Sequence, residues 1–189
     1  MVLIMYIQTE TTPNPQTLKF LPEKTVLPNG TRFYTSSMMA EESPLALTLF
    51  EVNGVNAVFL GSDFITITKD SAFDWSLLKP DLLTRIMDFF VAGHPVLFAK
   101  EKPQPKSHEN ASDIEKEIIE LIDARVRPSV AMDGGDIVFH SFKDGIVYLE
   151  MHGSCSGCPS STVTLKQGIE NMLKHYIPEV LAVEAVEEN

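Results

Sequence analysis

The sequence Gly153-Ser-Cys-Ser-Gly-Cys-Pro-Ser-Ser161 is the most informative segment of this chain. It holds both cysteines of the 189 residues, Cys155 and Cys158, in a CxxC pattern. An apolar segment typical of a strand precedes it, and Pro159 stands where proline is tolerated at the start of a helix. The sequence therefore predicts a strand-to-helix turn that carries two thiols. Two randomly placed cysteines would have this spacing in roughly one chain in a hundred, so we treat them as one site.

The residues on both sides of this turn predict a small domain with the order helix, strand, strand, helix, strand. Ser112-Asp-Ile-Glu115 is a capping box that begins the first helix, and Arg127-Pro128 is expected to end it. Asp133-Gly-Gly-Asp136 is expected to be a structural turn, and Lys143-Asp-Gly145 the tight turn of a hairpin. Strands are expected at residues 137–142, 146–151 and 180–186. The buried face of the second helix is expected to consist of Thr162, Leu165, Ile169, Met172, Leu173 and Tyr176.

The first half of the chain predicts a second domain of mixed helices and strands, so the fold class is α+β. Strands are expected at residues 18–21, 32–35, 55–60 and 64–68, and helices at residues 44–50 and 75–91. Residues 99–111 are polar, contain two prolines and cannot bury enough apolar surface to become ordered, which predicts a linker. The predicted boundaries are therefore a first domain at 1–98, a linker at 99–111 and a CxxC domain at 112–189.

The composition and charge exclude several classes of function. With 44% hydrophobic and 22% charged residues, the chain resembles ordinary soluble globular proteins. A net charge of −11 argues against nucleic acid as a partner, because binding it needs a basic face, and disfavours an anionic membrane. Two cysteines make no disulfide framework, and a working CxxC suits a reducing compartment. No secretory signal and no transmembrane run are recognisable, so we expect a cytoplasmic protein.

The CxxC pair at a helix start fits three kinds of chemistry: thiol–disulfide exchange, zinc binding and iron–sulfur cluster binding. The helix dipole and the free amides of the first turn favour anionic thiolates. Gly153 and Gly157 have no side chains, so backbone amides can approach a bulky anionic ligand. The alternative is a pair of buried thiols that pack as small apolar side chains, but the glycines and the proline argue against it.

Ligand counting separates these uses. A tetrahedral zinc ion or a [4Fe–4S] cluster needs four protein ligands, and one chain supplies two thiolates. His140 and His152 are the nearby candidates for the missing ligands, but each is expected to be a solvated or hydrogen-bonded histidine. Two chains that share one site on a two-fold axis are the simplest source of four thiolates. Thiol–disulfide exchange is the main rival, although no aromatic residue precedes Cys155 as in thioredoxin-like sites.

The CxxC sequence, together with Arg127-Pro128 and Asp133-Gly-Gly-Asp136, resembles the C-terminal domain of NifU, the Nfu family. The first half of the chain supports the same resemblance. Thr12-Pro-Asn-Pro-Gln-Thr-Leu-Lys-Phe20 and Asp63-Phe-Ile-Thr-Ile-Thr-Lys69 are similar to the N-terminal domain of mitochondrial and bacterial Nfu proteins. The resemblance covers nearly the whole chain except the linker.

The resemblance implies an iron–sulfur cluster scaffold or carrier without catalytic residues. It implies a [4Fe–4S] cluster bound between two subunits through Cys155 and Cys158 of each, with [2Fe–2S] as the alternative. It also implies a homodimer when loaded, cluster receipt from an upstream primary scaffold, and delivery to apo iron–sulfur client proteins. Because no transit peptide is recognisable, we expect the bacterial cytoplasm, with the mature mitochondrial matrix as the alternative.

Overall fold

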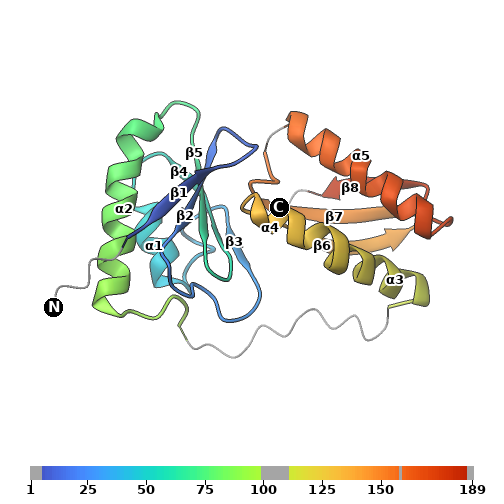
Figure 1. Ribbon diagram of the computed structural model, residues 1–189, viewed down its shortest axis with the longest axis horizontal. Helices are drawn as coiled ribbons and strands as arrows, with labels where there is room; N and C mark the ends of the chain where they lie inside the picture. The colour runs from blue at the N-terminus through green and yellow to red at the C-terminus, as the bar shows by residue number, and fades with distance from the viewer. Residues whose placement is uncertain (1–5, 99–110, 158, 187–189) are drawn as a thin grey trace. The chain divides into compact units, whose positions relative to one another are not determined.

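The computed structural model describes residues 6–98, 111–157 and 159–186, and only the backbone of residues 159–161. The chain divides into two compact units, Met1–Lys102 and Pro103–Asn189, drawn in blue to green and in yellow to red in Figure 1. Each unit combines helices with one sheet, which confirms the α+β prediction. Residues 99–110 of the predicted linker lie outside the described residues, and the predicted domain boundaries stay predictions.

The first unit is built on a five-stranded antiparallel sheet with the strand order β1-β2-β5-β4-β3. Its register places Leu18, Ile67, Val58 and Tyr34 side by side across four strands, and all four are buried. Alternation along each strand turns this row towards one face, where the core forms. The strands are β1 (Gln8–Thr11), β2 (Thr17–Leu21), β3 (Arg32–Tyr34), β4 (Val55–Leu60) and β5 (Ile65–Lys69).

Two helices, α1 (Pro44–Phe50) and α2 (Trp75–Ala92), cover that face of the sheet (Figure 1). Ser43 caps α1, since its hydroxyl oxygen accepts a hydrogen bond from the Ala46 amide at 3.2 Å. Gly93 ends α2 with a φ of 70°, the left-handed conformation that favours glycine. The helices bury one stripe each against the sheet, consisting of Leu45, Ala46 and Leu49 in α1 and Leu78, Leu82, Ile86 and Phe89 in α2.

The second unit begins with one continuous helical segment, composed of α3 (Asp113–Leu121), the π-helical turn η2 (Ile122–Val126) and α4 (Arg127–Met132). The capping box is confirmed, because Ser112 and Glu115 exchange both backbone-to-side-chain hydrogen bonds. The predicted end at Arg127-Pro128 is wrong. The Arg127 amide donates to the Ile122 carbonyl oxygen in a π-type bond, and Pro128 falls in the first turn of α4. Proline is tolerated in the first turn of a helix, where its fixed φ suits the helical conformation.

A three-stranded sheet follows, with the order β6-β7-β8. The strands β6 (Gly135–Lys143) and β7 (Ile146–Gly153) form the predicted hairpin, in which Asp144 and Gly145 both have positive φ. The helix α5 (Pro159–Tyr176) connects β7 to β8 (Ala182–Val186), which pairs with β7 in parallel. In α5, Ile169 and Leu173 are buried as predicted, but Tyr176 is 43% exposed and packs under the Arg125 guanidinium instead.

Candidate metal-cluster site

Cys155 lies in the turn between β7 and α5, as the sequence predicts. The turn is held by backbone bonds, with the Cys155 amide donating to the His152 carbonyl oxygen at 3.3 Å and the Ser156 amide donating to that of Gly153 at 3.2 Å. The Ser156 hydroxyl also donates to the Gly153 carbonyl oxygen, at 2.9 Å. Cys158 lies outside the described residues, so its place in the site stays a prediction.

Gly153 and Gly157 bracket Cys155 in left-handed backbone conformations, with φ values of 63° and 77°. A side chain at either position would be strained in that conformation. The backbone path of the turn therefore requires glycine at both positions. Their predicted contribution to cluster approach, through backbone amides, stays a prediction.

The Cys155 side chain is buried, and the backbone of Gly135 lies directly against it. A methyl group added at Gly135 would stand 2.5 Å from Cys155 Sγ and 2.9 Å from the His152 carbonyl oxygen. Gly135 pairs with Gly153 at the end of the β6–β7 ladder, which brings the two segments together. The Ser154 amide donates to the Gly134 carbonyl oxygen at 3.2 Å and closes the contact. The Asp133–Asp136 segment is thus a turn, as predicted, and also one wall of the thiol site.

Asp136 is the buried anion of this wall, and Arg127 is its partner. Arg127 Nε and Nη2 donate to the two carboxylate oxygens of Asp136 at 2.8 Å each. The Ile137 amide donates to Asp136 Oδ1 at 2.8 Å, and Arg127 Nη1 reaches Asp123 at 3.1 Å. Two parallel charge-assisted hydrogen bonds fix both groups in geometry as well as charge, and they raise the pKa of Arg127 above its ordinary value.

The electrostatics around Cys155 favour a thiol and not a thiolate. The pKa of Cys155 is raised to about 12, chiefly by burial; a hydrogen bond with Ser154 lowers it, and the charges of Asp133 and Asp136 add to the rise. The expectation that the helix start favours a thiolate is therefore wrong for Cys155 in this conformation. Loss of contact with water outweighs the dipole of a helix that begins only at Pro159.

The two histidines that could have completed a ligand set both contact the same carboxylate. His140 Nδ1 lies 2.8 Å from Glu150 Oε1, and His152 Nε2 lies 3.7 Å from Glu150 Oε2. In the described part of the chain, no group of three or more His, Cys, Asp or Glu side chains is arranged to hold a metal ion. The contact of His140 fits the expectation of a hydrogen-bonded histidine, whereas the 3.7 Å separation at His152 is longer than a hydrogen bond.

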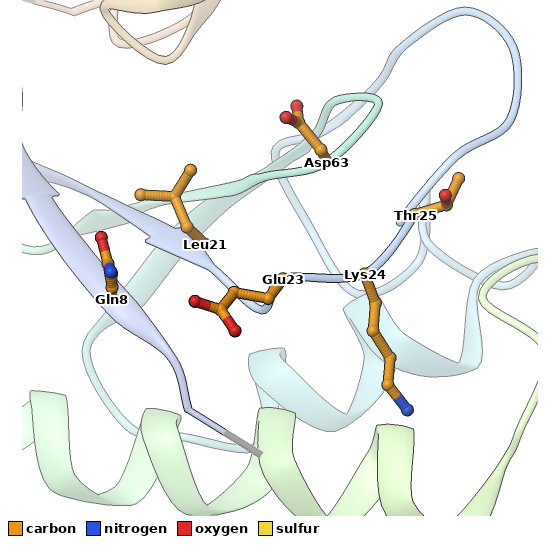
Figure 2. A pocket seen from close by; sticks show the side chains of 6 residues that line it. All are labelled: Gln8, Leu21, Glu23, Lys24, Thr25 and Asp63. Atoms are coloured by element: carbon orange, nitrogen blue, oxygen red, sulfur yellow. The ribbon is translucent and has the colours of Figure 1, made fainter.

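The first unit has a pocket of about 390 Å³ between the ends of β1 and β2 and the β4–β5 turn, lined by Gln8, Leu21, Glu23, Lys24, Thr25 and Asp63 (Figure 2). The polar lining consists of two carboxylates, an amide, an ammonium group and a hydroxyl, and Figure 2 shows Lys24 pointing away from Glu23. Such a lining supplies no thiolate ligand. Among the helices that the structure describes, none has both the length and the apolar character needed to cross a membrane.

Comparison with known proteins decides the family. The family model described as the NifU-like domain matches residues 118–184, and the one described as the scaffold protein Nfu/NifU N terminal matches residues 7–93. The chain belongs to the NifU-like (Nfu) family. The predicted resemblance is thereby confirmed for both units.

Relatives within the Nfu family are close along most of the chain. The human NFU1 iron-sulfur cluster scaffold homolog, mitochondrial, is 49% identical over 98% of this chain and 73% of its own length. The homolog from Drosophila persimilis is 52% identical over 96% of this chain and 65% of its own length, so the chain spans about two thirds of that relative. A solution structure of a NifU-like protein from Saccharomyces cerevisiae has a TM-score of 0.46 at 27% identity, covering 51% of this chain and 87% of that one.

Sequence reasoning located the CxxC turn but missed the wall that faces it. The sequence alone indicates only a turn for Gly135 and Asp136 and a helix end for Arg127. One signal could have indicated more: a basic residue on the first helix and an acidic residue at the start of the following strand can pair across the helix–strand turn.

Proposed function

We propose that this Nfu chain is an iron–sulfur cluster scaffold and carrier that is not itself an enzyme. Family membership supports the proposal, together with relatives that are named iron-sulfur cluster scaffold homologs. The observation that carries it is the position of Cys155, at a strand-to-helix turn that glycine backbones surround. Such a turn leaves room for a ligand larger than a single ion once Cys155 leaves Gly135.

The proposed cargo is a [4Fe–4S] cluster shared by two chains, with Cys155 and Cys158 of each chain as ligands. Four thiolates are the usual ligand set of such a cluster, and one chain has two cysteines. The nearest alternative ligands are His140 and His152, and both lie against the Glu150 carboxylate. A second copy of this chain is then the simplest source of the other two ligands, and [2Fe–2S] is the alternative cargo with the same ligand count.

Cluster uptake requires two changes at Cys155. The side chain must move out from behind Gly135, and the thiol must release its proton to solvent, because the thiolate is the iron ligand. Delivery reverses both steps, since cysteines of the recipient replace Cys155 and Cys158 at iron and the thiol returns to its buried position. A site whose cluster-free form is stable in this way favours release over retention.

The same features argue against thiol–disulfide exchange as the main function. An attacking thiol works best with a pKa near the ambient pH, whereas burial raises that of Cys155 to about 12. A structural zinc ion between two chains would use the same four thiolates. Metal analysis distinguishes the two cargoes, because a zinc site contains no acid-labile sulfide.

The proposed partners follow from the role. The chain receives its cluster from an upstream primary scaffold and passes it to apo iron–sulfur client proteins. The named relatives are mitochondrial, which supports the mitochondrial matrix and gives no support to the bacterial cytoplasm. Nucleic acid and membrane are not proposed as partners.

Substitution of the two cysteines tests the proposal. Cys155→Ala and Cys158→Ala should each abolish cluster binding after anaerobic treatment with iron and sulfide, while circular dichroism shows an intact fold. His140→Gln serves as the matched control that keeps its cluster. A Cys155→Ala chain that still assembles a cluster of the same iron content would overturn the assignment.

A further inference from the structure

A salt bridge links the helical segment of the second unit to the wall that covers Cys155. Arg127 opens α4 directly after the π-helical turn η2, so its side chain starts from a position that the turn sets. Its two hydrogen bonds to Asp136 are parallel and 2.8 Å long. Insertions of this kind in a helix are frequent at functional sites, because they redirect one side chain without ending the helix.

Asp136 transmits this anchoring to the backbone beside the thiol. The Asp136 side chain is only 5% exposed, and its carboxylate accepts a hydrogen bond from the Ile137 amide. Asp136 follows Gly135 directly in the chain. Gly135 touches Cys155 Sγ, and the neighbouring Gly134 carbonyl oxygen accepts the Ser154 amide. The ion pair of Arg127 with Asp136, the peptide bond from Asp136 to Gly135 and the contact of Gly135 with Cys155 therefore connect Arg127 to the thiol.

We propose that Arg127 and Asp136 are positioning residues for the cluster ligand: their ion pair holds the Gly134–Gly135 backbone over Cys155 and sets how readily this thiol becomes accessible. The inference rests on the proposed function for its biological meaning. The clamp itself is a property of the cluster-free chain and is measured without iron. With the ion pair intact Cys155 stays covered, and with the pair broken the wall loosens and Cys155 becomes accessible at equilibrium.

The test measures the rate at which iodoacetamide alkylates Cys155 in the cluster-free full chain, followed by mass spectrometry of the Cys155 peptide. Arg127→Gln and Asp136→Asn should each raise the rate at least about fivefold over wild type. Because both act through one pair, Arg127→Gln combined with Asp136→Asn should be no faster than the faster single variant. Arg127→Lys keeps the charge but loses the two-pronged geometry, and should fall between wild type and Arg127→Gln.

Two controls separate positioning from general loss of stability. Val130→Ala removes buried methyl groups from the same α4 without touching the ion pair. Its urea unfolding midpoint measures the loss of stability, and its alkylation rate then shows how much alkylation that loss alone causes. Arg125→Gln removes a cation from η2 that packs on Tyr176 and not on Asp136, and should alkylate like wild type.

Two results would overturn the clamp. One is that Cys155 is alkylated no faster in Arg127→Gln than in Val130→Ala when the two variants are compared at equal stability. The other is a double variant whose rate equals the product of the two single effects, since that would show independent action. If wild type takes up no cluster, the proposed function fails, but the alkylation series still decides the clamp.

The consequence for cluster handling uses the same variants. Loaded Arg127→Gln should transfer its cluster to an apo [4Fe–4S] recipient at an altered rate, with an unchanged absorption spectrum and iron content at saturation. Arg125→Gln should match wild type. A changed spectrum would instead mean that Arg127 shapes the ligand set itself and would contradict a positioning role.

Discussion

Gly135 and Cys155 are in direct contact although twenty positions separate them, and a methyl group on Gly135 would lie 2.5 Å from Cys155 Sγ. The contact exists because Gly135 pairs with Gly153 at the end of the β6–β7 ladder, so the chain returns to the start of β6 just before the thiol. Glycine is required here by the close approach of two segments and not by a positive φ, in contrast to Gly153 and Gly157. The Cys155 thiol is therefore packed against backbone.

Replacement of Gly135 by alanine should destabilise the second unit by roughly 1–3 kcal/mol. The new methyl group would overlap both Cys155 Sγ and the His152 carbonyl oxygen, and the backbone atom cannot move away as a flexible side chain could. Urea unfolding of Gly135→Ala measures the loss.

Gly168→Ala is the matched control in the same unit. Gly168 lies within α5, and a methyl group there would meet no atom within 4 Å. Alanine should stabilise the helix by roughly 0.5–1 kcal/mol. Equal effects of the two substitutions would show that Gly135 and Cys155 are not in contact.

Cys155→Ala should have an effect on stability that changes with pH. Burial raises the pKa of the folded-state thiol from its ordinary value near 9 to about 12. The folded chain then holds a proton that the unfolded chain releases, so this contribution to stability is fully present below pH 9 and declines as the pH rises towards 12.

Between pH 8 and pH 10 the stability difference between wild type and Cys155→Ala should shrink by about 1 kcal/mol. Urea unfolding of both proteins at the two pH values gives this difference, in which the titration of lysines and tyrosines cancels. A difference that is constant across this range would mean that Cys155 is not buried as a thiol.

His140→Gln and His152→Gln should each keep the full iron content after reconstitution. Neither histidine is expected to bind iron, because His140 Nδ1 is hydrogen-bonded to Glu150 at 2.8 Å and His152 Nε2 lies 3.7 Å from the same carboxylate. Iron and sulfide analysis of the purified, reconstituted variants measures this content. Loss of half or more of the iron in either variant would indicate a histidine ligand and would argue against two thiolates from each of two chains.

Ser43→Ala should destabilise the first unit alone, by about 1–2 kcal/mol. The fully buried Ser43 hydroxyl accepts from the Ala46 amide at 3.2 Å and donates to the Val96 carbonyl oxygen at 2.8 Å, and alanine leaves both groups unsatisfied. Hydrogen exchange should accelerate in α1 and remain unchanged in β7. Faster exchange in β7 would contradict independent stability of the two units.

Most of the fold could be predicted because it rests on local signals. The Ser43 and Ser112 caps, the Asp144-Gly145 turn and the apolar stripe of α2 are each determined by residues close in sequence. The error at Arg127-Pro128 arises from a π-type bond at Arg127, which shifts Pro128 into the first turn of a new helical segment. Local rules for proline do not anticipate such a turn.

The sequence predicts which thiols belong to the candidate site, but it does not predict what surrounds Cys155. The spacing of Cys155 and Cys158 follows from the sequence alone. The burial of Cys155 depends on a register that pairs Gly135 with Gly153, and the salt bridge of Arg127 with Asp136 depends on how α4 packs on β6. These are non-local contacts, and they reverse the expected protonation of the thiol.

The most direct test of the proposed function is anaerobic reconstitution with iron and sulfide, followed by determination of iron, acid-labile sulfide and molecular mass in solution. A shared [4Fe–4S] cluster predicts about four irons and four sulfides for each pair of chains, with the mass of a dimer when loaded. A monomer with two free thiols and no bound iron would contradict it, as would bound zinc without sulfide.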